Sequence, residues 1–219
     1  MNVMKEADIS IYHIDCMEFM KNKPDKYYDI AIVDPPYGCG GNGTILRTGG
    51  TWSKKYQKRE VSIKKWDFPP PPEYFKELFR VSKNQIIWGG NYFDLPPCRC
   101  FIVWHKLSIP ENFTMAMCEY AWTSFNANAK LFSYAPQGNK NNQRIHPTQK
   151  PVALYKWLIT RYSVKGDRIL DTHGGSMSIA LAAYNLNTTL EVCEVNPIYF
   201  NSGARRFKQY TQQPNLSLF

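Results

Sequence analysis

The sequence predicts an α/β fold with a mainly parallel central sheet, on the basis of three observations. Segments typical of strands alternate with segments typical of helices along most of the chain. The run Tyr28–Val33 is almost continuously apolar, as expected for a strand that is buried on both faces. The length of 219 residues, with 43% hydrophobic residues, fits a single domain over 1–219 that carries an insertion.

The residue patterns place the elements in a definite order. Strands rich in β-branched and aromatic residues are predicted at 9–13, 28–33, 85–88, 100–104, 119–125, 130–134, 168–171 and 188–193, with 119–125 and 130–134 as a strand pair. Helices are predicted at 15–22, 73–81, 147–162, about 176–185 and about 197–210, three of them with proline at the start. A flexible basic loop is expected at about 38–66, and a polar loop at 135–144.

Composition indicates the kind of partner. Lys and Arg number 27 against 18 Asp and Glu, so the net charge of +9 favours a polyanion, with nucleic acid ahead of a membrane surface. A basic protein without such a partner is the alternative. The six cysteines lack zinc-site spacing, so we expect reduced thiols and no metal. With no apolar run long enough to span a membrane and no signal-peptide core, the expected location is the cytoplasm.

The segment Asp34-Pro35-Pro36-Tyr37 directly follows the buried strand, where open α/β sheets have their binding sites. The two prolines fix the backbone and remove two N–H donors, so the turn presents carbonyl acceptors. With the Asp34 carboxylate and the Tyr37 ring, it suits a flat base that carries an amino group. Acceptance of both N–H groups, by Asp34 and by the Pro35 carbonyl, would stabilise the charge that develops on the attacking nitrogen. The alternative is a rigid proline turn without chemistry.

A second motif, Ile169–Ser176, combines a predicted strand, a glycine turn and the start of a helix. Gly174 and Gly175 let the backbone approach a ligand closely, and the helix N-terminus favours a carboxylate. Glu194 ends the next predicted strand, 23 residues after Asp171, at the position of an acid that binds ribose hydroxyls. Taken alone, this motif fits a nicotinamide dinucleotide enzyme equally well.

A third motif, His146-Pro147-Thr148-Gln149-Lys150-Pro151, precedes a predicted helix. Thr148 and the helix N-terminus offer donors to a carboxylate. A helix cap with proline in its first turn is the alternative interpretation.

These three motifs resemble the DNA adenine-N6 methyltransferases of the permuted β class. Residues 34–37 match the catalytic DPPY motif, 146–151 match the HPTQKP segment, and 171–177 resemble the cofactor loop, with Met177 where the last glycine is usual. The catalytic motif precedes the cofactor motif, which is the permuted order. Residues 12–16 resemble the segment ahead of the catalytic strand whose acid, here Asp15, contacts the adenine of the cofactor. Weaker similarities to phage- and prophage-associated members lie at 66–67, 87–93, 102–104 and 120–125, so the resemblance spans about 9–210.

The resemblance implies a Rossmann-like fold that uses S-adenosylmethionine to methylate N6 of a flipped-out adenine in double-stranded DNA, by direct displacement without a covalent enzyme intermediate. The catalytic residues that it implies are Asp34, Pro35, Pro36 and Tyr37. The cofactor contacts that it implies are Asp15, Cys16, Asp34, His146, Thr148, Lys150, Asp171, Thr172, His173, Gly174, Gly175, Ser176, Glu194 and Val195.

The basic loop and the region within about 89–146 are expected to face the DNA, the latter as the target-recognition region. The loop residues expected on phosphates are Arg47, Lys54, Lys55, Lys58, Arg59, Lys64 and Lys65. The tail from Gln213 to Phe219 resembles peptides that dock on bacterial sliding clamps, although packing on its own domain is the preferred interpretation. The expected source is a bacterium or a phage. A homodimer and a paired restriction enzyme are compatible with the sequence, which does not specify either.

Three alternatives stay open at this point. The same fold could act on cytosine N4 or on RNA adenine. A catalytically inactive, methyltransferase-like DNA-binding protein is suggested by Met177 and by Thr172-His173 in the cofactor loop. A nicotinamide dehydrogenase is disfavoured because it leaves the proline turn unexplained.

Overall fold

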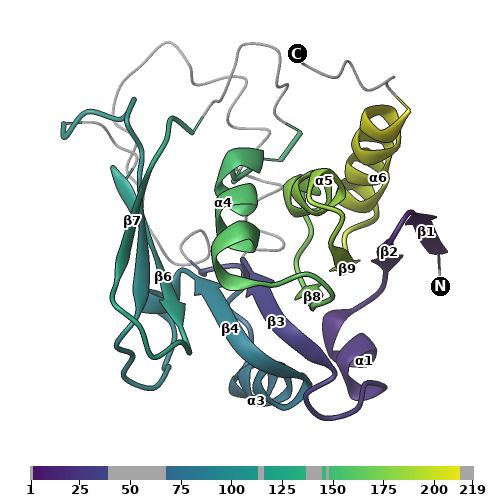
Figure 1. Ribbon diagram of the computed structural model, residues 1–219, viewed down its shortest axis with the longest axis horizontal. Helices are drawn as coiled ribbons and strands as arrows, with labels where there is room; N and C mark the ends of the chain where they lie inside the picture. Colours follow the sequence, from purple (N-terminus) through teal and green to yellow (C-terminus); the bar gives the residue numbers. More distant parts are fainter. Residues whose placement is uncertain (1, 39–67, 113–115, 137–144, 147, 213–219) are drawn as a thin grey trace.

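Nine strands form one sheet in the computed structural model, which describes residues 2–38, 68–112, 116–136, 145–146 and 148–212 (Figure 1). The strands are β1 (Asn2–Glu6), β2 (Ile9–His13), β3 (Tyr28–Val33), β4 (Ser82–Trp88), β5 (Phe101–His105), β6 (Cys118–Thr123), β7 (Lys130–Ser133), β8 (Arg168–Asp171) and β9 (Thr189–Glu194). The helices are α1 (Cys16–Lys21), α3 (Pro72–Val81), α4 (Val152–Tyr162), α5 (Ser178–Asn185) and α6 (Pro197–Thr211), with a short 3-10 turn η1 (Gly90–Tyr92).

The sheet is mainly parallel, as predicted. Its strand order is β1-β2-β9-β8-β3-β4-β6-β5-β7. Strands β2, β9, β8, β3 and β4 pair in parallel, and β7 pairs in parallel with β5. Only β1 and β6, among the strands of the described residues, run against this direction. This α/β architecture confirms the predicted fold class.

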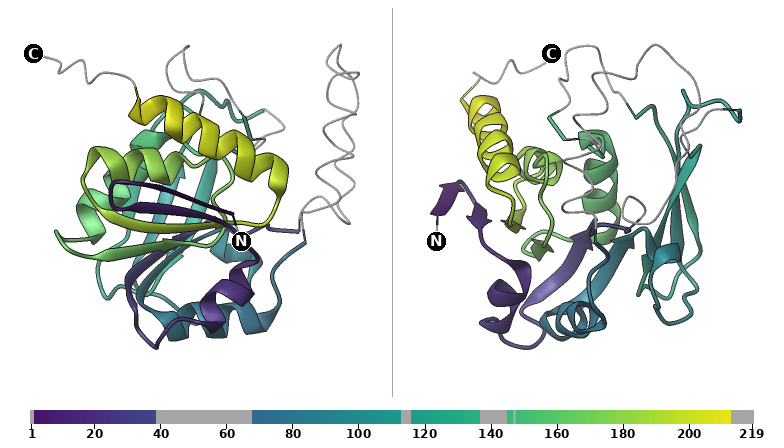
Figure 2. Two further views of the ribbon diagram at one scale, coloured as in Figure 1. Left: turned by 90° about the vertical axis from the view of Figure 1, so that its right-hand side faces the viewer. Right: turned by 180° about the vertical axis from the view of Figure 1, so that it is seen from behind.

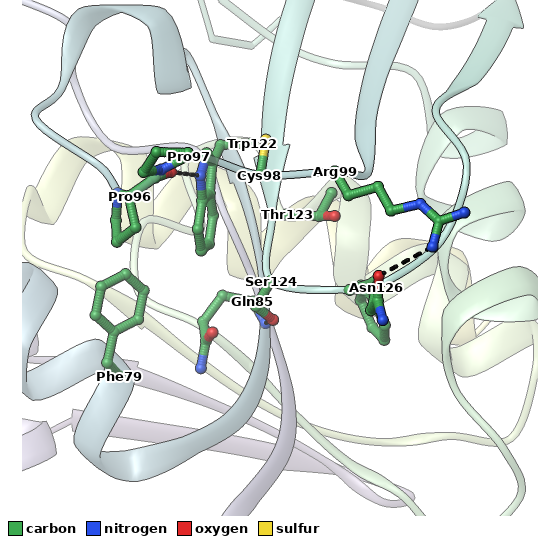
Figure 3. A pocket seen from close by; sticks show the side chains of 11 residues that line it. Phe79, Gln85, Pro96, Pro97, Cys98, Arg99, Trp122, Thr123, Ser124 and Asn126 are labelled. Atoms are coloured by element: carbon green, nitrogen blue, oxygen red, sulfur yellow. Dashed lines mark hydrogen bonds between the residues drawn. The ribbon is translucent and has the colours of Figure 1, made fainter.

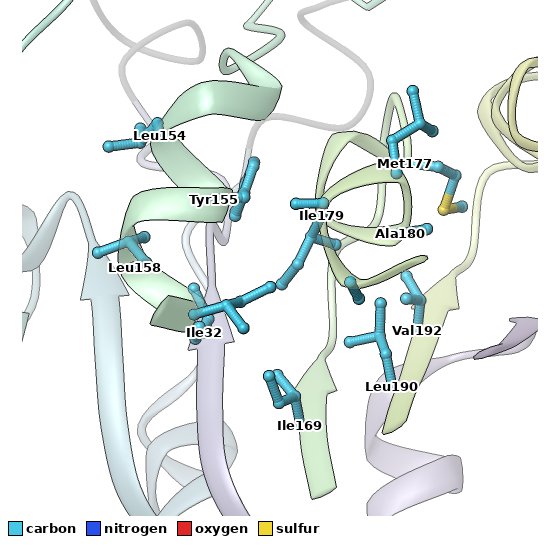
Figure 4. Close-up of a cluster of buried hydrophobic side chains, with 14 of the residues drawn as sticks. Ile32, Leu154, Tyr155, Leu158, Ile169, Met177, Ile179, Ala180, Leu190 and Val192 are labelled. Atoms are coloured by element: carbon cyan, nitrogen blue, oxygen red, sulfur yellow. The ribbon is translucent and has the colours of Figure 1, made fainter. Parts of the chain in front are cut away.

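Helices cover both faces of the sheet. Helices α1 and α3 lie on one face, and α4, α5 and α6 lie on the other (Figures 1 and 2). Successive side chains of strand β3 point to opposite faces of the sheet. Ile30 and Ile32 pack in the cluster with α4 and α5, while Ala31 and Val33 pack in the cluster with α3. Figure 4 shows Ile32 with Leu158 and other side chains of the first cluster. This double burial explains the continuous apolar run of the β3 sequence.

The connections on the two sides of the β3–β8 pair diverge. From β3 the chain crosses through α3 to β4, whereas from β8 it crosses through α5 to β9 on the opposite side. Strands β3 and β8 are neighbours, with Ile30 opposite Ile169. Their carboxyl ends therefore border the crevice in which open α/β sheets bind ligands.

Three sequence-based predictions about elements were wrong. Strand β1 was missed, because its mostly exposed side chains at the sheet edge show no apolar alternation. The helix expected at 147–162 begins at Val152, since Pro151 is extended and proline disfavours a helical residue before it. The strands near 119–125 and 130–134 exist as β6 and β7 but do not pair with each other, because both flank β5. Most of the polar loop predicted at 135–144 lies outside the described residues.

No helix within the described ranges has the length and apolar character that crossing a bilayer requires.

Candidate active site

Four carboxylates lie on consecutive strands at the carboxyl edge of the sheet. In spatial order they are Asp15, which follows β2, Glu194 at the end of β9, Asp171 at the end of β8, and Asp34, which follows β3. The register places His13 of β2 opposite Glu194. Because neighbouring strands are about 4.8 Å apart, the sheet gathers in one row the acids that the sequence singles out in separate motifs.

Asp34 is held by two side chains that also contact each other, because Lys150 Nζ donates to the Tyr37 hydroxyl at 3.2 Å. Its Oδ1 accepts a hydrogen bond of 2.7 Å from the Tyr37 hydroxyl, and its Oδ2 lies 2.5 Å from Lys150 Nζ. Burial raises the pKa of Asp34 above its ordinary value, and the Lys150 ammonium opposes this effect. The carboxylate is thus an acceptor in a nearly dry site, and only 15% of its side chain is exposed.

The Tyr37 ring is closely packed by two aromatic side chains and a glycine. It stacks on Tyr92 of η1 at a centroid distance of 5.1 Å and packs edge-on against Phe93. Gly89 makes this possible, because a Cβ there would lie 2.7 Å from Tyr37 Cζ and closer to two other ring carbons. Gly89 also has a left-handed φ of +69°, which glycine adopts without strain. One face of the ring expected to stack on a base is therefore already covered by Tyr92.

Two of the acids organise the glycine loop. Glu194 accepts hydrogen bonds of 2.8 Å from the Gly175 and Asn196 N–H groups, and Asp171 accepts one of 2.9 Å from His173 N–H. Burial raises the pKa of Asp171 to about 8, and burial also raises that of Glu194. Each carboxyl group retains lone pairs beyond these bonds, so the pair can still accept from amine or hydroxyl donors.

Met177 stands where the resemblance leads one to expect a glycine. Its backbone has the left-handed conformation that glycine adopts without strain. Its φ of 58° is left-handed, and its side chain is wholly buried at the start of α5 (Figure 4). Gly203 of α6 provides the space, because a Cβ there would lie 2.6 Å from Met177 Cγ. The loop backbone therefore keeps the shape that a glycine would give it, and the methionine side chain points into the core.

The third motif contacts the other two. The His146 ring lies 3.5 Å from where a Cβ on Gly175 would be, and it packs edge-on against Tyr199. Burial, with Lys150 nearby, lowers the pKa of His146 to about 4, so its neutral Nδ1 can accept from Thr148 at 3.2 Å. Thr148 precedes α4 by several residues and is exposed, so its predicted place at a helix N-terminus was wrong.

Lys150, which was predicted as a cofactor contact, forms ion pairs with two carboxylates. Its ammonium lies between Asp34 and Glu119. Nothing in the sequence marks Glu119, because it lies in an ordinary strand pattern of alternating residues. The segment from His146 to Lys150 thus contacts both the glycine loop, at Gly175, and the proline turn, at Asp34.

The remaining loop residues are tied to helices. The Thr172 hydroxyl lies 2.6 Å from the Tyr74 hydroxyl of α3 and 2.9 Å from His173 Nδ1. Arg206 of α6 donates to the Ser176 carbonyl at 2.7 Å. Tyr74 and Arg206 were not predicted, because their roles arise from helix packing across the sheet.

Two further predicted contacts lie beside the same row of acids. Burial raises the pKa of the Cys16 thiol to about 12, so it is neutral. Val195, which is exposed, contacts His13 Nε2 through its carbonyl at 3.2 Å.

Several predictions cannot be located. The seven basic loop residues (Arg47, Lys54, Lys55, Lys58, Arg59, Lys64 and Lys65), Pro147 and the tail at 213–219 lie outside the described residues. Within the part of the chain that is described, no cluster of three or more His, Cys, Asp or Glu side chains is arranged to hold a metal ion.

A separate hollow lies beside β6 and the loop before β5 (Figure 3). Phe79, Pro97 and Trp122 line it, Trp122 Nε1 donates to the Pro96 carbonyl at 2.6 Å, and Arg99 donates to Asn126. None of the predicted site residues contributes to it, so it is distinct from the row of acids.

The DNA methylase family model for N6 and N4 enzymes matches residues 85–205, more than half of the chain, and the chain belongs to this family. It is 24% identical to the Type II methyltransferase M2.MboI of Moraxella bovis, over 94% of this chain and 90% of that protein. It is 26% identical to the DNA adenine methyltransferase YhdJ of Escherichia coli K12, over 90% and 82% respectively.

Solved structures agree on the fold. The M1.HpyAVI–SAM complex superposes with a TM-score of 0.55 at 21% identity, covering 90% of this chain and 99% of that one. The PvuII DNA methyltransferase, which is cytosine-N4-specific, superposes with a TM-score of 0.62 at 15% identity, covering 96% and 94%. The predicted methyltransferase fold is confirmed, and both kinds of amino-group specificity occur among these similar proteins.

Proposed function

We propose that this DNA methylase transfers a methyl group from S-adenosylmethionine to N6 of an adenine flipped out of double-stranded DNA. The observation that carries the proposal is the Asp34 carboxylate, which follows β3 at the switch point and is flanked by the Pro35 carbonyl and the Tyr37 ring. An aspartate in the first position of the turn, and the adenine-methylating relative YhdJ, both support adenine.

The residues at the sheet edge fit the cofactor in donor chemistry. Asp15, Asp171 and Glu194 offer carboxylate oxygens to amine and hydroxyl groups, and a Cβ at Gly174 would meet Met177 Sδ at 2.7 Å, so the loop is closely packed as a cradle requires. We assign these acids, with Gly175 and the adjoining His146, to the cofactor. When bound, S-adenosylmethionine supplies an electrophilic methyl group on a positively charged sulfur.

The proline turn then acts on the base. Asp34 and the Pro35 carbonyl accept the two N–H groups of the amine, which draws its lone pair out of the ring and stabilises the positive charge that forms on nitrogen. Tyr37 stacks on the ring of the base. Because Tyr92, 53% exposed, covers one face of Tyr37, the base either displaces Tyr92 or takes the opposite face.

The finer family traits support the same proposal. The catalytic turn precedes the cofactor loop in the chain, which is the order of the permuted β class. Strands β6, β5 and β7 extend the sheet beyond β4 and belong to the region that we assign to target recognition. The basic residues from Arg47 to Lys65 are proposed to bind phosphates.

The test is methyl transfer with labelled S-adenosylmethionine to adenine-containing DNA, followed by identification of the labelled nucleoside. We expect N6-methyladenine from the wild type, and loss of label with Asp34→Ala and with the isosteric Asp34→Asn. Glu6→Gln, an exposed change on β1, is the matched control. Label in N4-methylcytosine would favour the specificity of the PvuII enzyme. No label on DNA or RNA, together with no cofactor binding by calorimetry, would favour an inactive DNA-binding protein.

A further inference from the structure

Four charged side chains form a buried chain of ion pairs beside the proline turn. Lys106 Nζ lies 2.7 Å from Glu119 Oε1, Lys150 Nζ lies 3.1 Å from Glu119 Oε2, and Lys150 Nζ lies 2.5 Å from Asp34 Oδ2. The two lysine side chains are only 7% and 2% exposed. Buried ion pairs stabilise a fold little more than well-packed apolar side chains do. We therefore infer that these ion pairs serve function rather than stability.

In this arrangement each oxygen of Asp34 already has a donor. Lys150 takes one carboxylate oxygen, and the Tyr37 hydroxyl donates to the other. An incoming amine can use the remaining lone pairs, but it then shares an oxygen with one of these donors. Sharing with the ammonium weakens the contact between Lys150 and Asp34, so a second carboxylate that holds the ammonium would favour capture of the base.

Glu119 is built to take up that contact. Its Oε1 is held by Lys106, which fixes the carboxylate on β6. Its Oε2 lies 3.1 Å from Lys150 Nζ, so this is the longer of the two ion pairs that the ammonium forms. A small movement of Lys150 Nζ away from Asp34 would shorten its contact with Glu119.

We propose that Glu119 is a positioning residue for methyl transfer, which holds the Lys150 ammonium while Asp34 exchanges that ammonium for the amine of the target base. Lys150 stays close enough to keep Asp34 ionised. Glu119 does not touch the base and acts only through Lys150. This inference rests on the proposed function, since it concerns how the same site captures an amine.

The charges predict opposite pH effects for the two partners. The groups that face Asp34 are Lys150, Tyr37, Glu119, Tyr155 and Asp171, with Lys106 beyond Glu119 and His146 beside Lys150. Lys150 lowers the pKa of Asp34 and Glu119 raises it. Burial opposes ionisation of Glu119, but the two ammonium groups bring its pKa to about 2, so it is a permanent anion. Removing Lys150 should therefore raise the pKa of Asp34, and removing the Glu119 charge should lower it.

The experiment is the single-turnover rate of methyl transfer to DNA, measured from pH 5.5 to 9 with saturating DNA and S-adenosylmethionine. With Glu119→Gln, Asp34 is the carboxylate that remains paired with Lys150, so the plateau rate should fall roughly ten- to a hundredfold. The fall of the rate at low pH, where Asp34 becomes protonated (the acidic limb), should move to lower pH by about one unit, because the negative charge of Glu119 is gone. With Lys150→Met, the limb should move to higher pH by at least as much. A purely structural role would not shift the two limbs in opposite directions.

Two further variants keep the test decisive if charge imbalance disturbs folding. The double variant Lys106→Met/Glu119→Gln leaves the Asp34–Lys150 pair balanced and should still be slow. Glu119→Asp retains the charge and should recover part of the rate and the wild-type limb. Glu6→Gln should change neither. If wild type transfers no methyl group, the proposed function and this inference both fail. If wild type is active but Glu119→Gln is equally fast, or both limbs move the same way, only this inference fails.

Discussion

Met177 provides a test in which glycine should be better tolerated than alanine. The residue has φ 58° and no exposed surface. Met177→Ala and Met177→Gly both lose the buried side chain, at a cost of about 2–5 kcal/mol. Only glycine also removes the strain of the left-handed backbone, which stabilises the variant by about 1–2 kcal/mol. The greater conformational freedom of glycine in the unfolded chain offsets roughly 0.5–1 kcal/mol of this gain. Met177→Gly should therefore be the more stable variant by about 0.5–1 kcal/mol.

The assay is urea unfolding of both variants at pH 7, with free energies compared only if the slopes agree. The matched control is Ala204→Gly in the interior of α6, where glycine should lower the free energy of unfolding by about 1 kcal/mol. The order of alanine and glycine at 177 should be the reverse of that at 204. If Met177→Ala equals or exceeds Met177→Gly in stability, the left-handed backbone carries no strain and the reasoning is wrong.

Three further predictions concern neighbouring groups. Gly203→Ala should destabilise the wild type by about 1–3 kcal/mol through its clash with Met177, and by less in the Met177→Gly background; equal losses in a double-mutant cycle would contradict this. Asp171 has a pKa of about 8 when folded against 3.8 ordinarily, so between these pH values the unfolded chain ionises first and stability falls as pH rises. The free energy of unfolding of Asp171→Asn, relative to that of wild type, should therefore rise by about 1.4 kcal/mol per pH unit between pH 5 and 7. A difference in urea unfolding that stays constant with pH would refute this prediction. Gly89→Ala should displace the Tyr37 ring and abolish methyl transfer, and a wild-type rate would show that the ring yields easily.

The parts of the site that follow strand ends could be predicted from the sequence. Asp34, Asp171 and Glu194 each stand directly after or at the end of an apolar run, and in a parallel sheet such positions share one edge. Residues that reach the site from an inserted strand or from a helix could not be predicted. Glu119 lies on an antiparallel strand inserted beside β4, and Tyr74 reaches the cofactor loop from a helix. Their roles depend on strand order and helix packing, which local periodicity does not encode.

The start of α4 shows a different kind of error. Proline is common in the first turn of a helix, so the sequence His146–Pro151 predicts a helix that begins near Pro147. A second proline at Pro151 disfavours the helical region for the residue before it, and α4 begins only at Val152. Before α4 the Gln149 N–H donates to the His146 carbonyl at 3.3 Å, as in a turn. In this arrangement His146 lies beside Gly175 while Lys150 reaches Asp34.

The position of Lys150 makes two aspartates on adjacent strands differ in how readily they ionise. Asp34 and Asp171 are both buried, and burial alone raises the pKa of each. Asp34 has an ammonium at 2.5 Å, whereas the hydrogen-bond donor to Asp171 is the backbone N–H of His173. Burial therefore favours the neutral form of Asp171, while Lys150 favours the carboxylate form of Asp34. A site that polarises an amine needs its full negative charge at the acceptor of that amine, and Lys150 supports this charge most directly at Asp34, with which it forms an ion pair.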